Sequence, residues 1–178
     1  MLGLIILIPI IGRYPVFKML IYGALITSIA LFPMAVPWMI YPWDIVTTHY
    51  VMAILAMVLV TLGEVIWSPR LNEYTASIAP KGQEGAYLGM SMIPWFAAKT
   101  TVSLISGHLL SRWALETVDI DGKAVPLQQA MIDGQLSYWD RPEAMWLYLG
   151  LFALAGCLVA WSLREWFEAA PRKRLEEN

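Results

Sequence analysis

AMWLYLGLFALAGCLVAWSL, residues 144–163, contains no charged side chain and decides the class of the fold. At about 1.5 Å per helical residue, a run of about 20 residues crosses the roughly 30 Å hydrocarbon core of a bilayer. A second uncharged run, Met19–Trp43, also meets that requirement. The whole chain of 178 residues is 58% hydrophobic and 15% charged, whereas soluble domains carry about 25% charged residues. We therefore predict an all-α integral membrane protein.

Prolines and polar turns divide the rest of the chain into helices. Pro33 and Pro37 close one apolar stretch, and the polar turn 79–84 closes another, because proline disfavours the helix interior. The first apolar run is too short to span, so we interpret it as the end of a helix that begins upstream, in a longer protein. In a single membrane domain we predict one truncated and four full helices, at about 1–12, 14–36, 49–78, 85–111 and 144–163, with a loop at 112–143 and a tail at 164–178.

The distribution of Lys and Arg predicts the orientation, because these residues concentrate on the cytoplasmic side of membrane proteins. With the helices placed alternately, Arg112, Lys123 and Arg141 fall on the side of the loop 112–143. The opposite side holds Arg13, Lys18, Arg70, Lys81, Arg164, Arg172, Lys173 and Arg174. We predict a multi-pass protein of the cell (inner or plasma) membrane, with a cytoplasmic C-terminus and an external loop. The chain has no basic patch that would indicate a nucleic-acid partner.

Glu64 is an acid inside an apolar stretch, in the run Gly63-Glu64-Val65-Ile66-Trp67-Ser68-Pro69. Hydrocarbon does not hydrate a carboxylate, and such residues commonly mark a binding site or an ion pathway. Glu64 lies 17 residues before Lys81, and Lys99 lies 17 residues after Gly82. Two antiparallel helices joined at this turn therefore bring both charges to a similar depth, on the order of 25 Å from the turn.

Helical spacing extends this pair into two polar stripes. The stripes are Glu64, Ser68 and Asn72 on one helix, and Trp95, Lys99, Ser103 and Ser106 on the other. If both face inward, Glu64, Lys99, Ser68 and Trp95 are candidates for substrate binding or proton coupling. The alternative is a closed Glu64–Lys99 ion pair that holds the two helices in register. A pair that opens when a proton or substrate binds would combine the two roles.

Arg70 and Glu73, at i and i+3 near the cytoplasmic end, predict a local ion pair or a gate. His49 and His108 lie on separate helices without a third ligand, so we expect no metal site and no cofactor. No phosphate-binding glycine loop, nucleophile motif or H-E-x-x-H motif occurs in the sequence, which argues against an enzyme.

Two features of the last span indicate packing. Cys157 is the single cysteine of the chain, and we expect it to be a small packing residue. Gly156-x-x-x-Ala160 permits a close approach of two helices, because small residues let helix backbones come together.

The stretch around Glu64 resembles one known family. The elements Glu64-x-x-x-Ser68-Pro69, Ala79-Pro80, Gly85 and Gly89 are similar to the tenth helix and following turn of the proton-dependent oligopeptide transporters, which belong to the major facilitator superfamily. The resemblance covers about Thr61–Gly107. The sequence departs from the family in Arg70-Leu71-Asn72-Glu73, which follows Pro69, and in Lys99, which has no counterpart.

The resemblance implies that the chain is the last four helices of a twelve-helix transporter plus the end of the eighth. Glu64 would then be the cavity acid that meets the amino group of a peptide, and Trp95 an aromatic residue lining the same cavity. The implied partners are the bilayer, a small solute, protons and the N-terminal helices of the same protein.

Two function hypotheses follow for the whole chain. The first is a secondary active transporter, a proton-coupled symporter of a small polar solute such as a peptide, working by alternating access. The second is a membrane scaffold or accessory subunit without transport, in which Glu64 and Lys99 form a structural pair.

Overall fold

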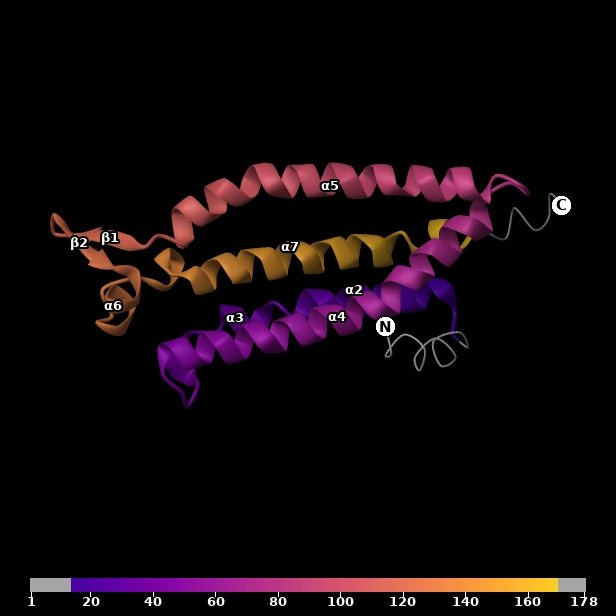
Figure 1. The fold of residues 1–178 in the computed structure, drawn as a ribbon. Coiled ribbons are helices and arrows are strands. Elements are labelled where there is room, and N and C mark those ends of the chain that lie inside the picture. The colour runs from indigo at the N-terminus through magenta and orange to yellow at the C-terminus, as the bar shows by residue number, and fades with distance from the viewer. Residues whose placement is uncertain (1–13, 170–178) are drawn as a thin grey trace.

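The computed structural model describes residues 14–169, which are mostly helical (Figure 1). The predicted partial helix at 1–12 and the end of the tail, 170–178, lie outside the described residues. The long helices are α2 (Val16–Ile29), α4 (Ile45–Ile78), α5 (Glu84–Trp113) and α7 (Pro142–Ser162). The shorter elements are α3 (Phe32–Ala35), η1 (Trp38–Ile40), β1 (Thr117–Ile120), β2 (Lys123–Pro126), α6 (Leu127–Ile132) and η2 (Tyr138–Asp140).

Three helical segments of the described chain are long and apolar enough to cross a membrane, namely Val16–Ala35, Ile45–Ile78 and Pro142–Ser162. α5, which we predicted as a fourth span, has 30 residues and therefore sufficient length, but it is not among these three. Lys99 and the hydroxyl and glycine residues of α5 lower its apolar character. The membrane class predicted from the uncharged runs is supported by these three segments.

The predicted helix 14–36 is two helices in the structure. α2 ends at Ile29, and α3 begins at Phe32 with Pro33 in its first turn, where a missing backbone N–H is tolerated. α4 begins at Ile45, four residues before the predicted start, because the Asp44 carboxylate accepts hydrogen bonds from the backbone N–H groups of Val46 and Thr47, at 3.1 and 3.0 Å. Such N-capping satisfies donors that have no partner inside the helix.

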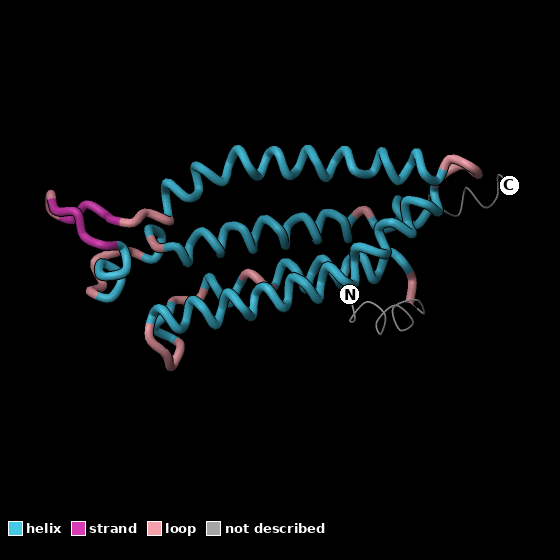
Figure 2. The backbone as a smooth tube through the Cα atoms, in the orientation of Figure 1, coloured by secondary structure: helices cyan, strands magenta, loops and turns pink. Residues whose placement is uncertain are grey.

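The segment predicted as a plain loop, 112–143, contains regular structure (Figure 2). β1 and β2 form an antiparallel two-stranded sheet in which Val118 pairs with Val125. Asp121 and Gly122 form its turn, with φ of 53° and 77°, a region that glycine and aspartate adopt more readily than other residues. We call the end of the molecule that carries this segment the loop end. The opposite end, where the turn 79–83 joins α4 and α5 into a helical hairpin, is the hairpin end.

α2, α4 and α7 pack into one group. The contact of α2 with α4 centres on two glycines, because a Cβ added to Gly23 would lie 2.8 Å from the Gly63 carbonyl oxygen. Between α2 and α7, the Ser28 hydroxyl lies 3.3 Å from the sulfur of Cys157, which is buried. The predicted packing role of Cys157 is confirmed. No helix of the described structure makes use of the close approach that Gly156 permits, because nothing lies within 4 Å of a Cβ built there.

An aromatic cluster closes this group at the hairpin end. Phe167, which follows α7, stacks on Phe17 of α2 with ring centroids 5.6 Å apart, and it meets Tyr74 of α4 edge-on at 6.1 Å. The Tyr74 hydroxyl also donates to the Phe167 carbonyl oxygen at 3.0 Å. The start of the C-terminal tail is therefore packed against α2 and α4.

α5 lies apart from the packed group. It runs along one edge of the molecule, joined to α4 at the hairpin end and to the strands at the loop end (Figure 1). None of its residues is buried within the described structure. α4, which contains Pro69, bends toward α5 in its last third (Figure 1), consistent with the kink that proline introduces into a helix. Within the described structure, α5 is therefore held to the rest of the molecule mainly at its two ends.

Candidate functional site

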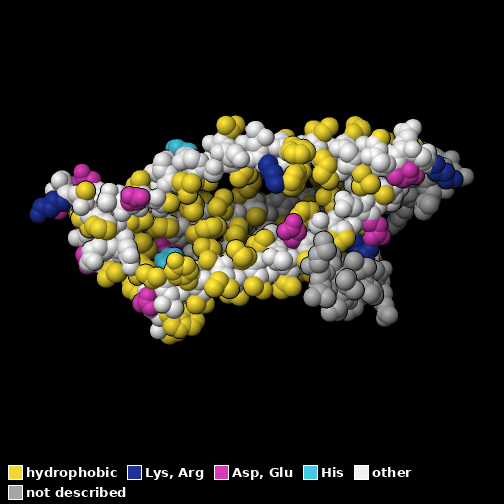
Figure 3. Space-filling view, in the orientation of Figure 1, with side chains coloured by type: hydrophobic (Ala, Val, Ile, Leu, Met, Phe, Trp, Pro, Cys, Tyr) yellow, Lys and Arg dark blue, Asp and Glu magenta, His cyan; other side chains and the backbone are white. Residues whose placement is uncertain are grey.

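Polar side chains in the second half of α4 line an open hollow of about 350 Å³, and all of the residues that line it belong to this helix. The stripe predicted from helical spacing, Glu64, Ser68 and Asn72, lies on its wall together with Thr61, Val65 and Pro69. Figure 3 shows that this face of the molecule is hollowed between α5 and the helices below it.

The packing of α4 on α2 sets the direction in which Glu64 points. Gly63 and Arg70 lie seven residues apart, close to two helical turns, and both are buried on the packed side of α4. Each residue of a helix is rotated about 100° from the one before it. Glu64, next to Gly63, is therefore turned out of the packed group, and its side chain is exposed in the described structure.

Lys99 and Trp95 form a second polar element on α5. The Lys99 ammonium nitrogen lies 3.6 Å from the centroid of the Trp95 ring, which is a cation–π contact. The spacing of four residues places one side chain above the other on the helix surface. Both residues are exposed in the described structure. The predicted stripe continues to Ser103 and Ser106, where the Ser106 hydroxyl donates to the Ser103 carbonyl oxygen.

The closed Glu64–Lys99 ion pair, which we considered as a structural alternative, does not form in the described structure. The two ion pairs within residues 14–169 are Arg70–Glu73 and Arg112–Asp140. Counting residues from the turn predicts that Glu64 and Lys99 lie at equal depth along the two helices. The count carries no information on the lateral separation of the helices. Because α5 stands away from α4 in its middle, the two charges do not meet.

Arg70 and Glu73 form the local ion pair predicted from their i, i+3 spacing. The Arg70 side chain is 7% exposed and that of Glu73 is 52% exposed. A largely buried guanidinium therefore depends on one carboxylate that reaches toward the surface of α4. This geometry fits the local pair, and the alternative role as a gate stays a prediction.

Neither His49 nor His108 belongs to a cluster of potential metal ligands within residues 14–169. The Nδ1 atom of His49 lies 2.6 Å from the Ile45 carbonyl oxygen one turn earlier in α4. Its ring lines an apolar cavity of about 440 Å³ at the loop end, beside Met131 and Pro142. The described residues contain no cluster of three or more His, Cys, Asp or Glu side chains able to hold a metal ion.

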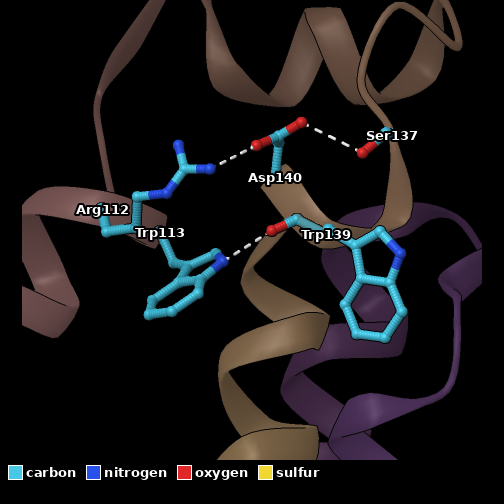
Figure 4. A network of polar contacts seen from close by, with 5 residues as sticks. All are labelled: Arg112, Trp113, Ser137, Trp139 and Asp140. Atoms are coloured by element: carbon cyan, nitrogen blue, oxygen red, sulfur yellow. Dashed lines mark hydrogen bonds and ion pairs between the residues drawn. The ribbon is translucent and has the colours of Figure 1, made fainter.

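A polar network at the loop end was not predicted from the sequence (Figure 4). Arg112, at the end of α5, donates to Asp140 of η2 at 2.7 Å, and the Ser137 hydroxyl donates to the other oxygen of the same carboxylate at 3.0 Å. The indole N–H of Trp113 donates to the Trp139 carbonyl oxygen at 2.8 Å. The contacts of Arg112 and Trp113 tie the loop end of α5 to η2, which precedes α7. These two contacts join residues 28 and 26 positions apart, a separation that helical periodicity does not address.

Comparison with known proteins adds no assignment for this arrangement. No family model, no curated protein and no solved structure matches the chain.

Proposed function

We propose that the chain is the C-terminal portion of a secondary active transporter of the major facilitator type. It carries a small polar solute, such as a peptide, together with protons, by alternating access. Its place is the cell membrane, with the C-terminus in the cytoplasm and the loop end outside. The observation that supports this proposal most directly is that Glu64, which has no ion-pair partner within residues 14–169, lines a polar hollow on a helix long and apolar enough to cross a membrane.

The first support is energetic. Glu64 has no ion-pair partner within residues 14–169, and hydrocarbon offers none. A charged group at the centre of a bilayer is unfavourable by at least about 2.5–3.5 kcal/mol, so such groups face a bundle interior or a water-filled cavity. The polar face of α4 therefore requires water or further protein over it. The N-terminal helices of a longer protein would supply that cover.

α5 carries a second polar face, which does not line the hollow on α4. One side of α5 carries Lys99 and Trp95, while other positions expose large apolar side chains such as Ile93 and Phe96, at 64% and 61%. A helix of this kind suits the wall of a cavity, with apolar residues toward lipid or neighbouring helices and polar residues toward the solute. In the proposed transporter, α5 is the fourth membrane span.

The two charges have different tasks in this proposal. Glu64 binds a cationic group of the solute, such as an amine, or carries the coupling proton. Lys99, held over the Trp95 ring, binds an anionic group. Ser68, one turn from Glu64 on the same cavity wall, adds a hydroxyl that donates or accepts a hydrogen bond. Charges that remain apart leave both groups available to a ligand, which a closed pair would not.

The test is Glu64→Gln in the complete protein, reconstituted in vesicles with an imposed proton gradient. Gln keeps the size of the side chain and removes both its charge and its ability to bind a proton. Proton-driven uptake should fall by about 100-fold, the upper range for loss of a hydrogen bond to a charged group at about 1.4 kcal/mol per factor of ten.

Glu116→Gln is the matched control, because Glu116 is an exposed acid in the segment between α5 and β1. Uptake by this variant should equal that of the unmodified protein. If Glu64→Gln also transports normally with an unchanged pH dependence, the proposed role of Glu64 is wrong. The scaffold hypothesis would gain support if the charge-reversed double variant Glu64→Lys/Lys99→Glu retained full function while each single variant failed to assemble.

A further inference from the structure

Pro69 interrupts the backbone hydrogen bonds of α4 beside the candidate site. Proline has no backbone N–H, so it cannot donate to the carbonyl oxygen four residues earlier in a helix. In α4 that carbonyl belongs to Val65. Val65 and Pro69 both line the polar hollow that contains Glu64 and Ser68. The missing helix bond therefore lies at the hollow, on the side of α4 that is turned out of the packed group.

The Val65 carbonyl oxygen has no side-chain donor within the described structure. A backbone carbonyl requires a hydrogen-bond partner, and one freed in a membrane helix is satisfied by a hydroxyl side chain, by water or by what occupies the adjoining cavity. The nearest hydroxyl, that of Ser68, makes no hydrogen bond among residues 14–169. In α5, by contrast, the Ser91 hydroxyl donates to the Leu88 carbonyl oxygen at the same spacing, at 2.7 Å.

Three hydrogen-bond acceptors of neighbouring residues are therefore available at the hollow. They are the carboxyl group of Glu64, the carbonyl oxygen of Val65 and the hydroxyl oxygen of Ser68. The hydroxyl of Thr61, which lines the same hollow, donates instead to the Met57 carbonyl oxygen at 2.8 Å. The acceptors lie within about one helical turn of one another.

Among residues 14–169, no positively charged side chain lines the hollow. Arg70 follows Pro69 directly, but its side chain is 7% exposed and forms an ion pair with Glu73. Lys99 of α5 contacts the ring of Trp95. A group of acceptors that includes an acid and lacks a cation of its own suits a ligand that is both positively charged and a hydrogen-bond donor.

We propose that the Val65 carbonyl oxygen, left open by Pro69, binds a primary ammonium group of the solute together with Glu64 and Ser68. This assignment rests on the proposed transport function, which it narrows to solutes that carry a primary amine. A primary ammonium group has three N–H donors, one for each acceptor. A quaternary ammonium group has the same charge but no N–H, so it cannot use Val65 or Ser68. Pro69 is a positioning residue, because it acts by leaving the carbonyl of Val65 open.

Binding of two probes of equal charge tests the proposal. The probes are n-propylammonium and n-propyltrimethylammonium, titrated against the complete protein in phosphatidylcholine nanodiscs and followed by saturation-transfer NMR. The unmodified protein should bind n-propylammonium more tightly. Pro69→Ala restores a backbone N–H that occupies the Val65 carbonyl oxygen. This variant should bind n-propylammonium about tenfold more weakly, as expected for loss of a hydrogen bond to a charged group, with unchanged affinity for n-propyltrimethylammonium.

Pro94→Ala is the matched control. Pro94 also lies inside a long helix, α5, but Met90, whose carbonyl it leaves open, does not line the hollow. This variant should bind both probes as the unmodified protein does. Ser68→Ala removes another acceptor without altering the backbone bonds, and it should also weaken n-propylammonium selectively. It replaces Pro69→Ala as the test if that variant does not fold.

The proposal is overturned if Pro69→Ala keeps the full preference for n-propylammonium. An equal loss of affinity for both probes also overturns it, because a changed shape of the hollow would affect both. Lack of a preference in the unmodified protein has the same consequence. Uptake by Glu64→Gln reports separately on the proposed function. Normal uptake would contradict the transport role of Glu64, while a preference lost in Pro69→Ala would still support the amine site, so the two failures are distinguishable.

Discussion

Gly63 of α4 lies directly against Gly23 of α2, so that a Cβ added to Gly63 would come within 2.7 Å of the Gly23 carbonyl oxygen and 2.2 Å of the Thr27 hydroxyl oxygen. This contact fixes the face on which α4 packs. It thereby turns Glu64, the next residue, toward the open cavity. The position of the candidate site depends on a contact made by its sequence neighbour.

Gly63→Ala should destabilise the protein by about 1–3 kcal/mol, because overpacking of a closed contact forces the two helices apart. Thermal unfolding in detergent measures the effect. Gly89→Ala is the control, since nothing lies within 4 Å of a Cβ built on Gly89 in α5. That change should be neutral or stabilising by up to about 1 kcal/mol, because glycine is a poor helix former. Equal unfolding temperatures for the two variants would contradict the packing described.

Lys99→Met should weaken uptake of solutes that carry an anionic group by about tenfold or more in KM, while affecting neutral solutes little. A hydrogen bond to a charged group contributes about 1.5–3 kcal/mol, and about 1.4 kcal/mol corresponds to a factor of ten. Lys99→Arg, which keeps the charge, should retain part of the uptake. Lys123→Met, at an exposed lysine of β2, serves as the control. An equal loss for anionic and neutral solutes would assign Lys99 a structural role.

The Arg112–Asp140 ion pair should contribute little to stability despite its short distance. Its side chains are 56% and 42% exposed, and exposed pairs contribute about 0.2–1 kcal/mol. A double-mutant cycle with Arg112→Ala and Asp140→Ala should yield a coupling energy in this range that declines as salt increases. A coupling of several kcal/mol, unchanged by salt, would show that the network is closed to water.

Asp44 should make the start of α4 sensitive to acid. Hydrogen bonds from Thr47, through its side chain and then its backbone, lower the pKa of Asp44 below its ordinary value of 3.8. A depressed carboxyl pKa stabilises the folded state above the unfolded-state value, and this stabilisation is lost as pH falls through the folded-state pKa. Thermal stability should therefore decline below about pH 3.8.

Asp44→Asn isolates this effect, because asparagine caps a helix about as well as aspartate but does not titrate in this range. The difference in melting temperature between the two proteins should shrink below pH 3.8. A difference that stays constant through this range would show that Asp44 does not stabilise α4 through its charge.

The sequence is informative where one local property decides the outcome. The uncharged runs 19–43 and 144–163 predict membrane helices, and the structure has apolar helical segments at both places. The i, i+3 spacing of Arg70 and Glu73 predicts their ion pair, because helix geometry alone brings such residues together. The same periodicity predicts that Glu64, Ser68 and Asn72 share one face.

Prediction fails where the outcome depends on distant segments. The closed Glu64–Lys99 pair was considered because equal depth can be counted along the chain, but the distance between α4 and α5 depends on what packs between them. The two strands and the short helices within 112–143 are too short to show a periodic pattern in the sequence, so they were not predicted. In the sequence, Glu143 resembles an ordinary acid in the first turn of a helix. Its burial arises from contacts with other segments of the chain.

The sequence by itself determined the membrane class, the positions of the long helices and the polar face of α4, because hydropathy and helical period are local. Only the tertiary structure decided that α2 packs on α4 through Gly23 and Gly63, and that α5 stands apart so that Lys99 meets no carboxylate within residues 14–169. It also decided that the Glu143 side chain is enclosed, with no hydrogen-bond partner among the described residues. These outcomes arise from close packing between segments far apart in the chain, a property that no single stretch of residues contains.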